Sequence, residues 1–293
     1  MREYDLVIIG GGAAGILSSI EAKKKGINNI IVIEKDPVIG GMLSSIDYPI
    51  NKDKTVTGKE YKEALLKELQ DYDVEVQLNT MVLKIEDKEV VCTSATNGIE
   101  KIKGKNIIIA NGGREGGRKA IDMVGDRCSG IYNVSMTKKV FAMNMIPGKK
   151  VFIYGNATLY MIEEYLKNSN IEVVGIVTTN GKETYGLTDN IYEGYTIESI
   201  DGEGRVSSVK LVKGNEEKIV NCDTLIFSMP MISDGIVSMR SGIQLNPETA
   251  GTKVDEKFQT SKEGIFAIGN GIYIHNYIED IEKECCDVIN NIF

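Results

Sequence analysis

The chain begins with a strand, a glycine-rich turn and a helix in direct succession. Residues 5–9 (DLVII) are apolar enough for a buried strand, and the turn 10–15 (GGGAAG) follows without a break. Gly10 permits the sharp turn, Gly12 lets a ligand phosphate approach the backbone, and Gly15 lets the helix pack closely on the strand. The helix would point its free N–H groups and the positive end of its dipole at that phosphate. This order of elements predicts a βαβ unit at the start of the fold.

The second strand of this unit adds a ligand for ribose. Residues 30–33 (IIVI) form a short apolar run that leads into Glu34. A carboxylate roughly 20 residues after the glycine turn accepts hydrogen bonds from ribose hydroxyls, and its charge repels a 2′-phosphate. The unit is therefore predicted to bind an adenine dinucleotide, and a glycine-rich turn without a ligand is the alternative.

A second strand–turn–helix pattern in the middle of the chain lacks most of these glycines. Residues 150–154 (KVFIY) predict a strand, but only Gly155 of the glycine pattern follows it. Ala157 brings a β-carbon to the path of a pyrophosphate, and Tyr160 replaces the usual third small residue. The next strand ends in residues 177–180 (VTTN), which offer neither a carboxylate for ribose nor an arginine for a 2′-phosphate. NAD(P)H binding is therefore doubtful here, and a scaffold role is favoured over weak NAD binding.

The alternation of strands and helices predicts an α/β fold with parallel sheets. We expect two Rossmann-like domains, each with three layers (ββα), of which the second is inserted into the first. The first domain, which contains the intact glycine turn, comprises residues 1–113 and 234–293. The second, a domain of NAD(P)-binding type with a degenerate motif, comprises residues 114–233.

A short strand and turn near the C-terminus return to the first domain. Residues 264–270 (GIFAIGN) predict a strand that ends in a glycine turn, and residues 277–292 predict a helix. The carboxyl end of a parallel strand lies at the crevice where such sheets bind ligands. Asn270 is therefore expected at the dinucleotide.

These motifs resemble those of the pyridine nucleotide–disulfide oxidoreductases, a superfamily of thioredoxin-reductase-like flavoproteins with two dinucleotide domains. The glycine turn 10–15 with Glu34 is similar to the FAD fingerprint of the superfamily, and residues 264–270 are similar to its late flavin motif. The resemblance covers nearly the whole chain and implies an FAD-dependent oxidoreductase. It carries FAD contacts onto Gly10, Gly12, Ala13, Ala14, Gly15, Glu34, Lys35, Gly41, Met42, Val82, Ala110, Asn111, Gly112, Gly269, Asn270 and Tyr277.

Within the superfamily, the chain is most similar to FAD-dependent subunits of the hydrogen cyanide synthase, sarcosine oxidase and opine dehydrogenase type. Similar proteins accompany anaerobic glycerol-3-phosphate dehydrogenases. Residues 145–149 (MIPGK), 185–190 (YGLTDN) and 269–275 (GNGIYIH) carry this likeness. The loop 42–48 departs from the branch because it lacks the usual Cys and His.

The resemblance also suggests where the chemistry takes place. In such folds the flavin performs the hydride or electron transfer, and the protein supplies position and electrostatics. By resemblance, the helix that starts near Tyr277 faces the pyrimidine side of the flavin ring. His275, the only histidine, lies just before this helix and is the candidate catalytic residue. It either hydrogen-bonds the flavin or a substrate, or it is a helix-start residue bonded to the backbone.

Charge and composition limit the possible partners. The formal net charge of −8 argues against a nucleic-acid surface, which needs clustered Lys and Arg. No transmembrane helix is predicted, because the apolar stretch 6–20 contains several glycines and is explained by the βαβ unit. With one histidine and no cysteine cluster, the chain shows no metal-ligand spacing. We therefore expect a cytoplasmic protein without a metal site.

Five cysteines in a cytoplasmic protein indicate free thiols. The sequence has no C-x-x-C pair of the kind that passes electrons from a flavin to a disulfide substrate. Cys285 and Cys286 are adjacent on the predicted last helix, where a normal disulfide is difficult to close. The chain is therefore not expected to be a disulfide reductase.

Three functions remain open on this basis. The first, which we favour, is an FAD-dependent oxidoreductase subunit that exchanges electrons with a partner dehydrogenase or an iron–sulfur electron carrier. The second is an NAD(P)H-dependent flavin reductase with a modified nicotinamide site. The third is a non-catalytic scaffold, either flavin-binding or even flavin-free. A homodimer is the alternative to a complex with a different partner.

Overall fold

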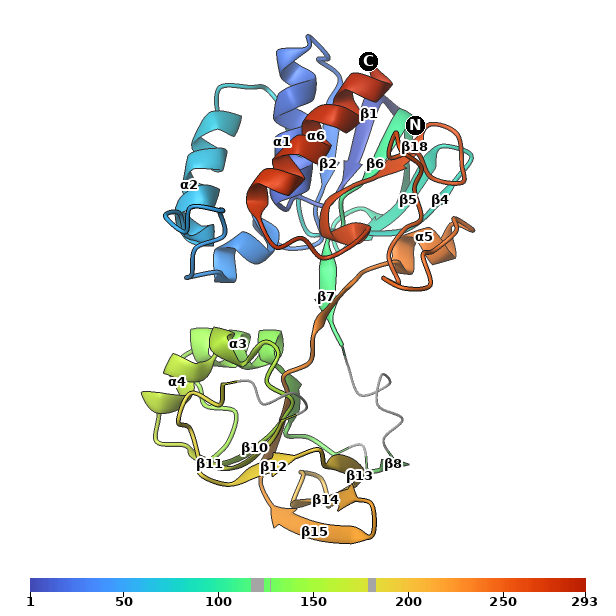
Figure 1. Ribbon diagram of the computed structural model, residues 1–293. Helices are drawn as coiled ribbons and strands as arrows, with labels where there is room; N and C mark the ends of the chain where they lie inside the picture. The colour runs from blue at the N-terminus through green and yellow to red at the C-terminus, as the bar shows by residue number, and fades with distance from the viewer. Residues whose placement is uncertain (117–123, 127, 179–182) are drawn as a thin grey trace. The chain divides into compact units, whose positions relative to one another are not determined.

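The protein is described by a computed structural model that covers residues 1–116, 124–126, 128–178 and 183–293, and these form two compact units (Figure 1). The first unit comprises Met1–Arg114 and Ile232–Phe293, and the second comprises Glu115–Met231. The second unit is thus inserted in the chain of the first. Two short strands, β7 (Gly113–Glu115) and β17 (Met231–Ser233), pair with each other where the chain passes between the units.

The first unit is built on a parallel sheet that continues into an antiparallel meander. The sheet order is β3-β2-β1-β6-β5-β4, and β18 also pairs with β6. The parallel strands are β1 (Arg2–Ile9), β2 (Ile30–Ile33), β3 (Glu75–Gln77), β6 (Gly98–Ile109) and β18 (Ile265–Ala267). The meander strands are β4 (Thr80–Glu86) and β5 (Glu89–Ser94), which run antiparallel to each other and, for β5, to the first half of β6.

The side chains of the parallel strands fill two hydrophobic cores, because successive residues of a strand point to opposite faces. On one face, Leu6, Ile8 and Ile108 pack against Cys285 and Val288. Cys285 and Val288 belong to α6 (Ile278–Ile292). Figure 1 shows α6 next to α1 (Ala13–Lys24), and the two helices cover this face of the sheet. On the other face, residues such as Val7, Ile9 and Ile107 pack against the meander. The result is the expected three-layer arrangement.

Shorter helices complete the first unit. Helix α2 (Gly58–Leu69) begins with a capping box between Thr57 and Glu60, and its Leu65 packs against α1. The remaining elements are α5 (Ile236–Arg240) and two 3₁₀ turns, η1 (Gly41–Ser45) and η4 (Gly269–Gly271).

The second unit repeats the plan with shorter helices. Its parallel sheet has the order β12-β11-β10-β16-β9, and its meander the order β15-β14-β13-β8. The parallel strands are β9 (Ile131–Asn133), β10 (Lys150–Tyr154), β11 (Glu172–Thr178), β12 (Ile191–Glu193) and β16 (Thr224–Phe227). The other elements are β8 (Val124–Gly125), β13 (Thr196–Asp201), β14 (Ser208–Lys213), β15 (Glu216–Asn221), α3 (Val134–Ala142), η3 (Leu159–Met161) and α4 (Glu163–Lys167).

One predicted element differs clearly from the structure. The sequence pattern predicts a helix over residues 159–168, whereas the chain forms the 3₁₀ turn η3 and then the five-residue helix α4. Residues 179–180, part of the degenerate strand end discussed above, lie outside the described residues. In the part of the chain that the structure covers, no helix is long and apolar enough to span a membrane.

Candidate functional site

The glycine turn of the first unit leaves an open space in front of helix α1. Gly10 has φ +108°, and a β-carbon there or at Gly15 would collide with backbone oxygen atoms. At Gly12, by contrast, the nearest neighbour of an added β-carbon is the Cα of Gly41, at 4.0 Å. No side chain caps the N-terminus of α1, so its first N–H groups have no side-chain partner. This is an uncapped helix end behind an open cradle, the arrangement that binds phosphate groups.

Glu34 is fixed beside this turn by two backbone hydrogen bonds. Its side chain follows β2, and the residue is only 5% exposed. One carboxylate oxygen accepts from the N–H of Gly11 at 2.6 Å, and the other accepts from the N–H of Asp36 at 2.8 Å. A carboxylate oxygen accepts more than one hydrogen bond, so Glu34 retains capacity for a ribose hydroxyl.

The ends of β6 and β18 bring two further polar groups to the same edge of the sheet. Asn111 follows β6, and its amide nitrogen donates to the backbone oxygen of Asp234 at 2.7 Å. Its Oδ1 is buried and has no partner among the described residues. A β-carbon at Gly271 would approach this oxygen to 2.9 Å, and one at Gly269 would approach the Cβ of Ala14 to 2.9 Å. The late turn therefore lies against both the glycine turn and Asn111.

The structure thus places most of the predicted FAD-binding residues together. The predicted positions are the β1–α1 turn (Gly10, Gly12, Ala13, Ala14, Gly15), the end of β2 (Glu34, Lys35), η1 (Gly41, Met42), β4 (Val82), the end of β6 (Ala110, Asn111, Gly112), η4 (Gly269, Asn270) and the N-cap of α6 (Tyr277). Lys35 is exposed, and Tyr277, at the N-cap of α6, is 39% exposed. The open cradle at Gly12 and the unpartnered oxygen of Asn111 fit a bound dinucleotide.

His275 lies in a buried cluster directly behind the late turn. Its Nδ1 is 3.0 Å from Oδ1 of Asn270, and its Nε2 is 2.8 Å from Oε1 of Glu284. The other oxygen of Glu284 accepts a hydrogen bond from the backbone N–H of Gly269 at 2.8 Å. The His275 ring also packs on the ring of Tyr273, with 4.0 Å between centroids. Both ring nitrogens are thus engaged inside the protein, and the catalytic role of His275 stays a prediction.

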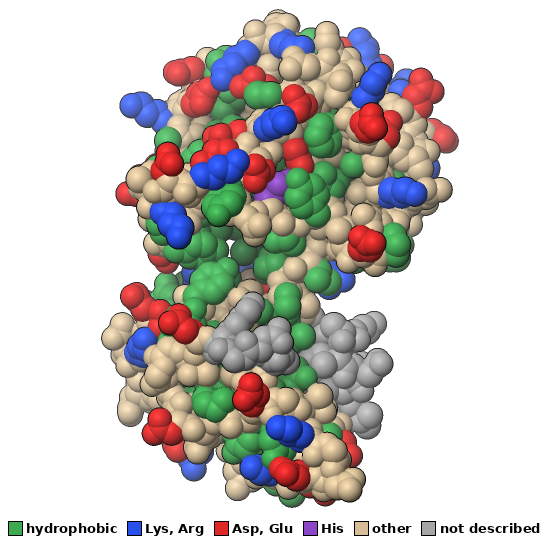
Figure 2. All heavy atoms as spheres, viewed as in Figure 1, with side chains coloured by type: hydrophobic (Ala, Val, Ile, Leu, Met, Phe, Trp, Pro, Cys, Tyr) green, Lys and Arg blue, Asp and Glu red, His purple; other side chains and the backbone are tan. Residues whose placement is uncertain are grey.

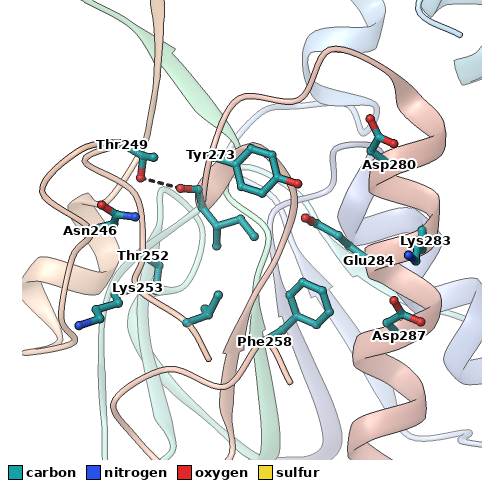
Figure 3. A pocket seen from close by; sticks show the side chains of 12 residues that line it. Asn246, Thr249, Thr252, Lys253, Phe258, Tyr273, Asp280, Lys283, Glu284 and Asp287 are labelled. Carbon is teal, nitrogen blue, oxygen red and sulfur yellow. Dashed lines mark hydrogen bonds between the residues drawn. The ribbon is translucent and has the colours of Figure 1, made fainter. Parts of the chain in front are cut away.

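Glu284 also forms part of the wall of a pocket. Figure 2 shows the histidine in purple among acidic and hydrophobic side chains, and its side chain is only 1% exposed. Figure 3 shows the hydroxyl of Tyr273 directed at the carboxylate of Glu284, on one side of a pocket of about 690 Å³. Burial raises the pKa of Tyr273 above its usual value, and the nearby Glu284 adds to this. The contact between His275 and Glu284 is therefore buried, while Tyr273 and Glu284 form part of the pocket wall.

Sequence reasoning did not identify Glu284. The signal was available, because Glu284 lies three residues after Ile281 and four before Val288, on the apolar stripe of α6. An acid at such a position is rarely buried without a partner. Its partner His275 precedes the helix, however, so no helical spacing connects the two residues.

The turn of the second unit has no comparable open site. The backbone N–H of Ala157 donates to the backbone oxygen of Ser228, and the N–H of Thr158 donates to the Ser228 hydroxyl, both at 3.0 Å. Thr158 is buried, and a 3₁₀ turn follows it in place of a full helix. Tyr160 does not fill the turn, since its side chain is 39% exposed while Leu159 is fully buried. The N–H groups that a dinucleotide would need are therefore already paired.

Known proteins show both the family and the fold. The model of the pyridine nucleotide-disulphide oxidoreductase family matches residues 4–157. A ferredoxin–NADP reductase of Streptococcus gordonii is 26% identical over 287 residues, which cover 91% of this chain and 85% of the relative. A ferredoxin–NADP reductase of Picrophilus torridus is 20% identical and covers 92% of this chain and 86% of its own length.

Solved structures agree with the two-domain architecture. The thioredoxin reductase of T. acidophilum superposes with a TM-score of 0.74 at 20% identity, over 100% of this chain and 98% of its own. The bacillithiol disulfide reductase of Bacillus cereus superposes with a TM-score of 0.76 at 16% identity, over 99% of both chains. These likenesses confirm the predicted α/β fold with two Rossmann-like domains. The chain belongs to the pyridine nucleotide-disulphide oxidoreductase family, and it is an FAD-binding oxidoreductase of that family.

Proposed function

We propose that this protein is an FAD-dependent oxidoreductase that exchanges electrons with a protein partner, and that it uses neither a nicotinamide cofactor nor a redox disulfide. The contrast between the two turns carries this proposal. In the first unit the cradle at Gly12 is open, whereas in the second the N–H groups of Ala157 and Thr158 are paired with Ser228. One unit is thus prepared for a dinucleotide, and the other is closed to it.

The partner is proposed to be an iron–sulfur carrier of the ferredoxin type or a partner dehydrogenase. The ferredoxin–NADP reductases to which the chain is similar carry the name of such a partner, and we extend that part of their name to this protein. When bound, FAD accepts electrons in pairs or singly, which makes it suitable for exchange with a one-electron carrier. The protein holds the flavin by the α1 N-terminus, Glu34 and the late turn.

The cysteines support a function without thiol chemistry. All five are free thiols, and Cys92, Cys222 and Cys285 are buried. Cys285 is enclosed between α6 and α1, where its thiol donates to the backbone oxygen of Ala14 at 3.3 Å, while Cys286 is exposed. A dithiol that reduces a substrate needs two accessible sulfur atoms that can join each other. The adjacent pair does not meet this condition.

The predicted likeness to subunits of the hydrogen cyanide synthase, sarcosine oxidase and opine dehydrogenase type stays part of this proposal. It rests on the late motif, in which Asn270 and His275 contact each other. A subunit of that kind acts in a complex, so a partner dehydrogenase is the expected assembly and a homodimer is the alternative.

A second candidate is a self-contained NAD(P)H-dependent flavin reductase. It is favoured by the names of the relatives, which include NADP. It requires that the second turn open by breaking the hydrogen bonds to Ser228, each of which contributes about 1 kcal/mol.

Anaerobic reduction of the FAD-loaded protein separates the two candidates. We expect reduced ferredoxin or reduced methyl viologen to bleach the flavin absorbance within seconds. NADH and NADPH, at about 1 mM, should leave the absorbance unchanged for minutes, a time far longer than one turnover of a typical flavoenzyme. Rapid bleaching by NADH or NADPH would establish the second candidate. A protein that takes up no FAD would exclude both candidates and leave the scaffold.

A further inference from the structure

The cluster behind the late turn fixes the orientation of the Asn270 side chain. The backbone N–H of His275 lies 3.0 Å from Oδ1 of Asn270, and a backbone N–H can only donate. The atom that faces it must therefore be the amide oxygen and not the amide nitrogen. This assignment follows from the chemistry of the donor and does not depend on the state of the histidine ring.

The same oxygen then fixes one proton of the histidine ring. His275 Nδ1 is also 3.0 Å from Oδ1 of Asn270, and an amide oxygen can only accept. Nδ1 must therefore carry a hydrogen atom. Since Asn270 accepts two hydrogen bonds from a single residue, its side-chain rotation is restricted from both sides.

Glu284 holds the other nitrogen of the ring. With a proton on Nδ1, the 2.8 Å contact between Nε2 and Oε1 contains one more proton, carried by the ring or by the carboxyl group. The other oxygen of Glu284 accepts a hydrogen bond from the N–H of Gly269, which holds the carboxyl group in place. The side chains of His275 and Glu284 are 1% and 8% exposed, so water does not compete for these contacts. Both ring nitrogens of His275 are therefore held by hydrogen bonds inside the protein.

We propose that His275 and Glu284 are positioning residues that turn the amide nitrogen of Asn270 toward bound FAD. This inference rests on the proposed function, because it assumes that FAD occupies the cradle at Gly12. With Oδ1 engaged, Asn270 has only its N–H₂ group left, and this group has no partner within the described residues. It can only donate, so it fits an acceptor oxygen of the FAD phosphate or ribityl chain. Glu284 meanwhile holds the backbone of Gly269, so the pair fixes both Gly269 and Asn270.

The single histidine makes the state of the ring directly measurable. We expect the ¹⁵N NMR spectrum of an untagged, FAD-free sample with labelled histidine to show one imidazole ring with a proton on Nδ1 at pH 7. The Glu284→Gln variant should keep this proton, because a glutamine amide can donate to Nε2 while Nδ1 continues to donate to Asn270. A ring that is protonated only on Nε2 would overturn the proposal.

A double-mutant cycle measures whether His275 acts through Asn270. We expect His275→Ala and Asn270→Ala each to raise the Kd for FAD about tenfold, and the double variant to bind no more weakly than Asn270→Ala. His275→Asn places an N–H donor near the position of Nδ1 and should keep most of the affinity. Lys283→Ala, an exposed neighbour of Glu284 on α6, is the matched control and should not change the Kd.

The outcomes separate this inference from the proposed function. If the wild-type protein binds no FAD, the proposed function fails, and the positioning role fails with it whatever the NMR spectrum shows. If the wild-type protein binds FAD but His275→Ala binds it equally well, or the two single effects add in full, only the positioning role is wrong. Circular dichroism melting curves identify a variant that does not fold. If His275→Ala does not fold, the Kd for FAD of His275→Asn is compared with that of the wild-type protein instead, because this substitution disturbs the core less.

Discussion

The hydroxyl oxygen of Ser228, at the end of β16, accepts a hydrogen bond from the backbone N–H of Thr158 at 3.0 Å. Its backbone oxygen accepts another from the N–H of Ala157 at 3.0 Å. One residue thus pairs both of the N–H groups that a Rossmann turn presents to a pyrophosphate. The turn of the second unit is thus hydrogen-bonded to the end of its own sheet.

Restoring small residues in the second turn should therefore not restore nicotinamide binding. We expect Ala157→Gly combined with Tyr160→Ala to show no NADH binding up to about 1 mM in a fluorescence titration, a limit that corresponds to about 4 kcal/mol of binding free energy. Adding Ser228→Ala frees the N–H of Thr158 and should lower the Kd below that of the double variant. If the double variant binds NADH as well as the triple one, the hydrogen bonds to Ser228 do not close the site.

Alanine at two glycines of the first turn should affect different properties, namely FAD binding at Gly12 and the stability of the fold at Gly15. At Gly12 a β-carbon has no neighbour closer than 4.0 Å, whereas at Gly15 it would collide with the backbone oxygen of Gly10. Gly12→Ala should change the free energy of unfolding of the FAD-free protein by less than about 0.5 kcal/mol. It should nevertheless weaken FAD binding at least tenfold, because the methyl group enters the phosphate path. Gly15→Ala should lower the free energy of unfolding by about 1–3 kcal/mol. Urea denaturation and FAD titration of both variants provide the measurements, and normal FAD binding by Gly12→Ala would contradict the placement of the phosphates.

Thiol labelling should distinguish Cys286 from its neighbour Cys285. Burial raises the pKa of the Cys285 thiol far above its usual value and that of Cys222 to about 12. The pKa of Cys286 is also raised, by partial burial and by Glu21, but this thiol is exposed. A thiolate is the reactive form, so buried thiols of raised pKa react slowly. In the native protein at pH 8 we expect one fast reaction with an aromatic disulfide reagent, which Cys286→Ser removes. Fast labelling of Cys285 as well as Cys286 would reopen the case for a redox pair, whereas labelling of the half-buried Cys128 would not.

The stability of the second unit should depend on pH through Asp223. Burial alone would raise the pKa of Asp223, but backbone N–H groups of Lys149 and Lys150 and the hydroxyl of Thr224 donate to it and lower the pKa overall. A lowered pKa in the folded state contributes stability above the pKa of the unfolded chain, and this is lost as the pH falls through the folded value. Asp223→Asn should therefore lower the free energy of unfolding at pH 7, and the difference should narrow below about pH 4. Urea denaturation at pH 7 and pH 3 tests this, and an equal difference at both pH values would contradict it.

The strands of the parallel sheets could be predicted because buried strands are continuous apolar runs. Residues 150–154 coincide with β10, and the turn 10–15 leads from the end of β1 into the first turn of α1 as expected. Much of the candidate FAD site could be predicted for the same reason, since the carboxyl ends of neighbouring parallel strands meet at one edge. That edge can be recognised in the sequence by glycines such as Gly10 and Gly15, where a β-carbon would collide with backbone atoms.

The contacts that decide the function could not be predicted in this way. Ser228 is 70 positions from Thr158, and nothing in the local pattern of either residue indicates their hydrogen bonds. The predicted helix 159–168 is replaced by the 3₁₀ turn η3, directly after Thr158, and the short helix α4. Similarly, His275 and Glu284 meet because the chain between η4 and α6 folds back on the helix, which neither helical nor strand periodicity expresses.

Strand β6 pairs with β18 at Ile107 and Ile265, so the central sheet of the first unit joins residues from opposite ends of the chain. During synthesis the second unit has its full sequence as soon as Met231 has emerged, while the first still lacks β18 and α6. Domains fold as units once their sequence is available. We therefore expect the inserted unit to fold before the first unit. A nascent chain that stops before β18 then contains one folded domain and an incomplete sheet. The apolar faces of that sheet stay exposed, and can aggregate, until β18 and α6 have been synthesised.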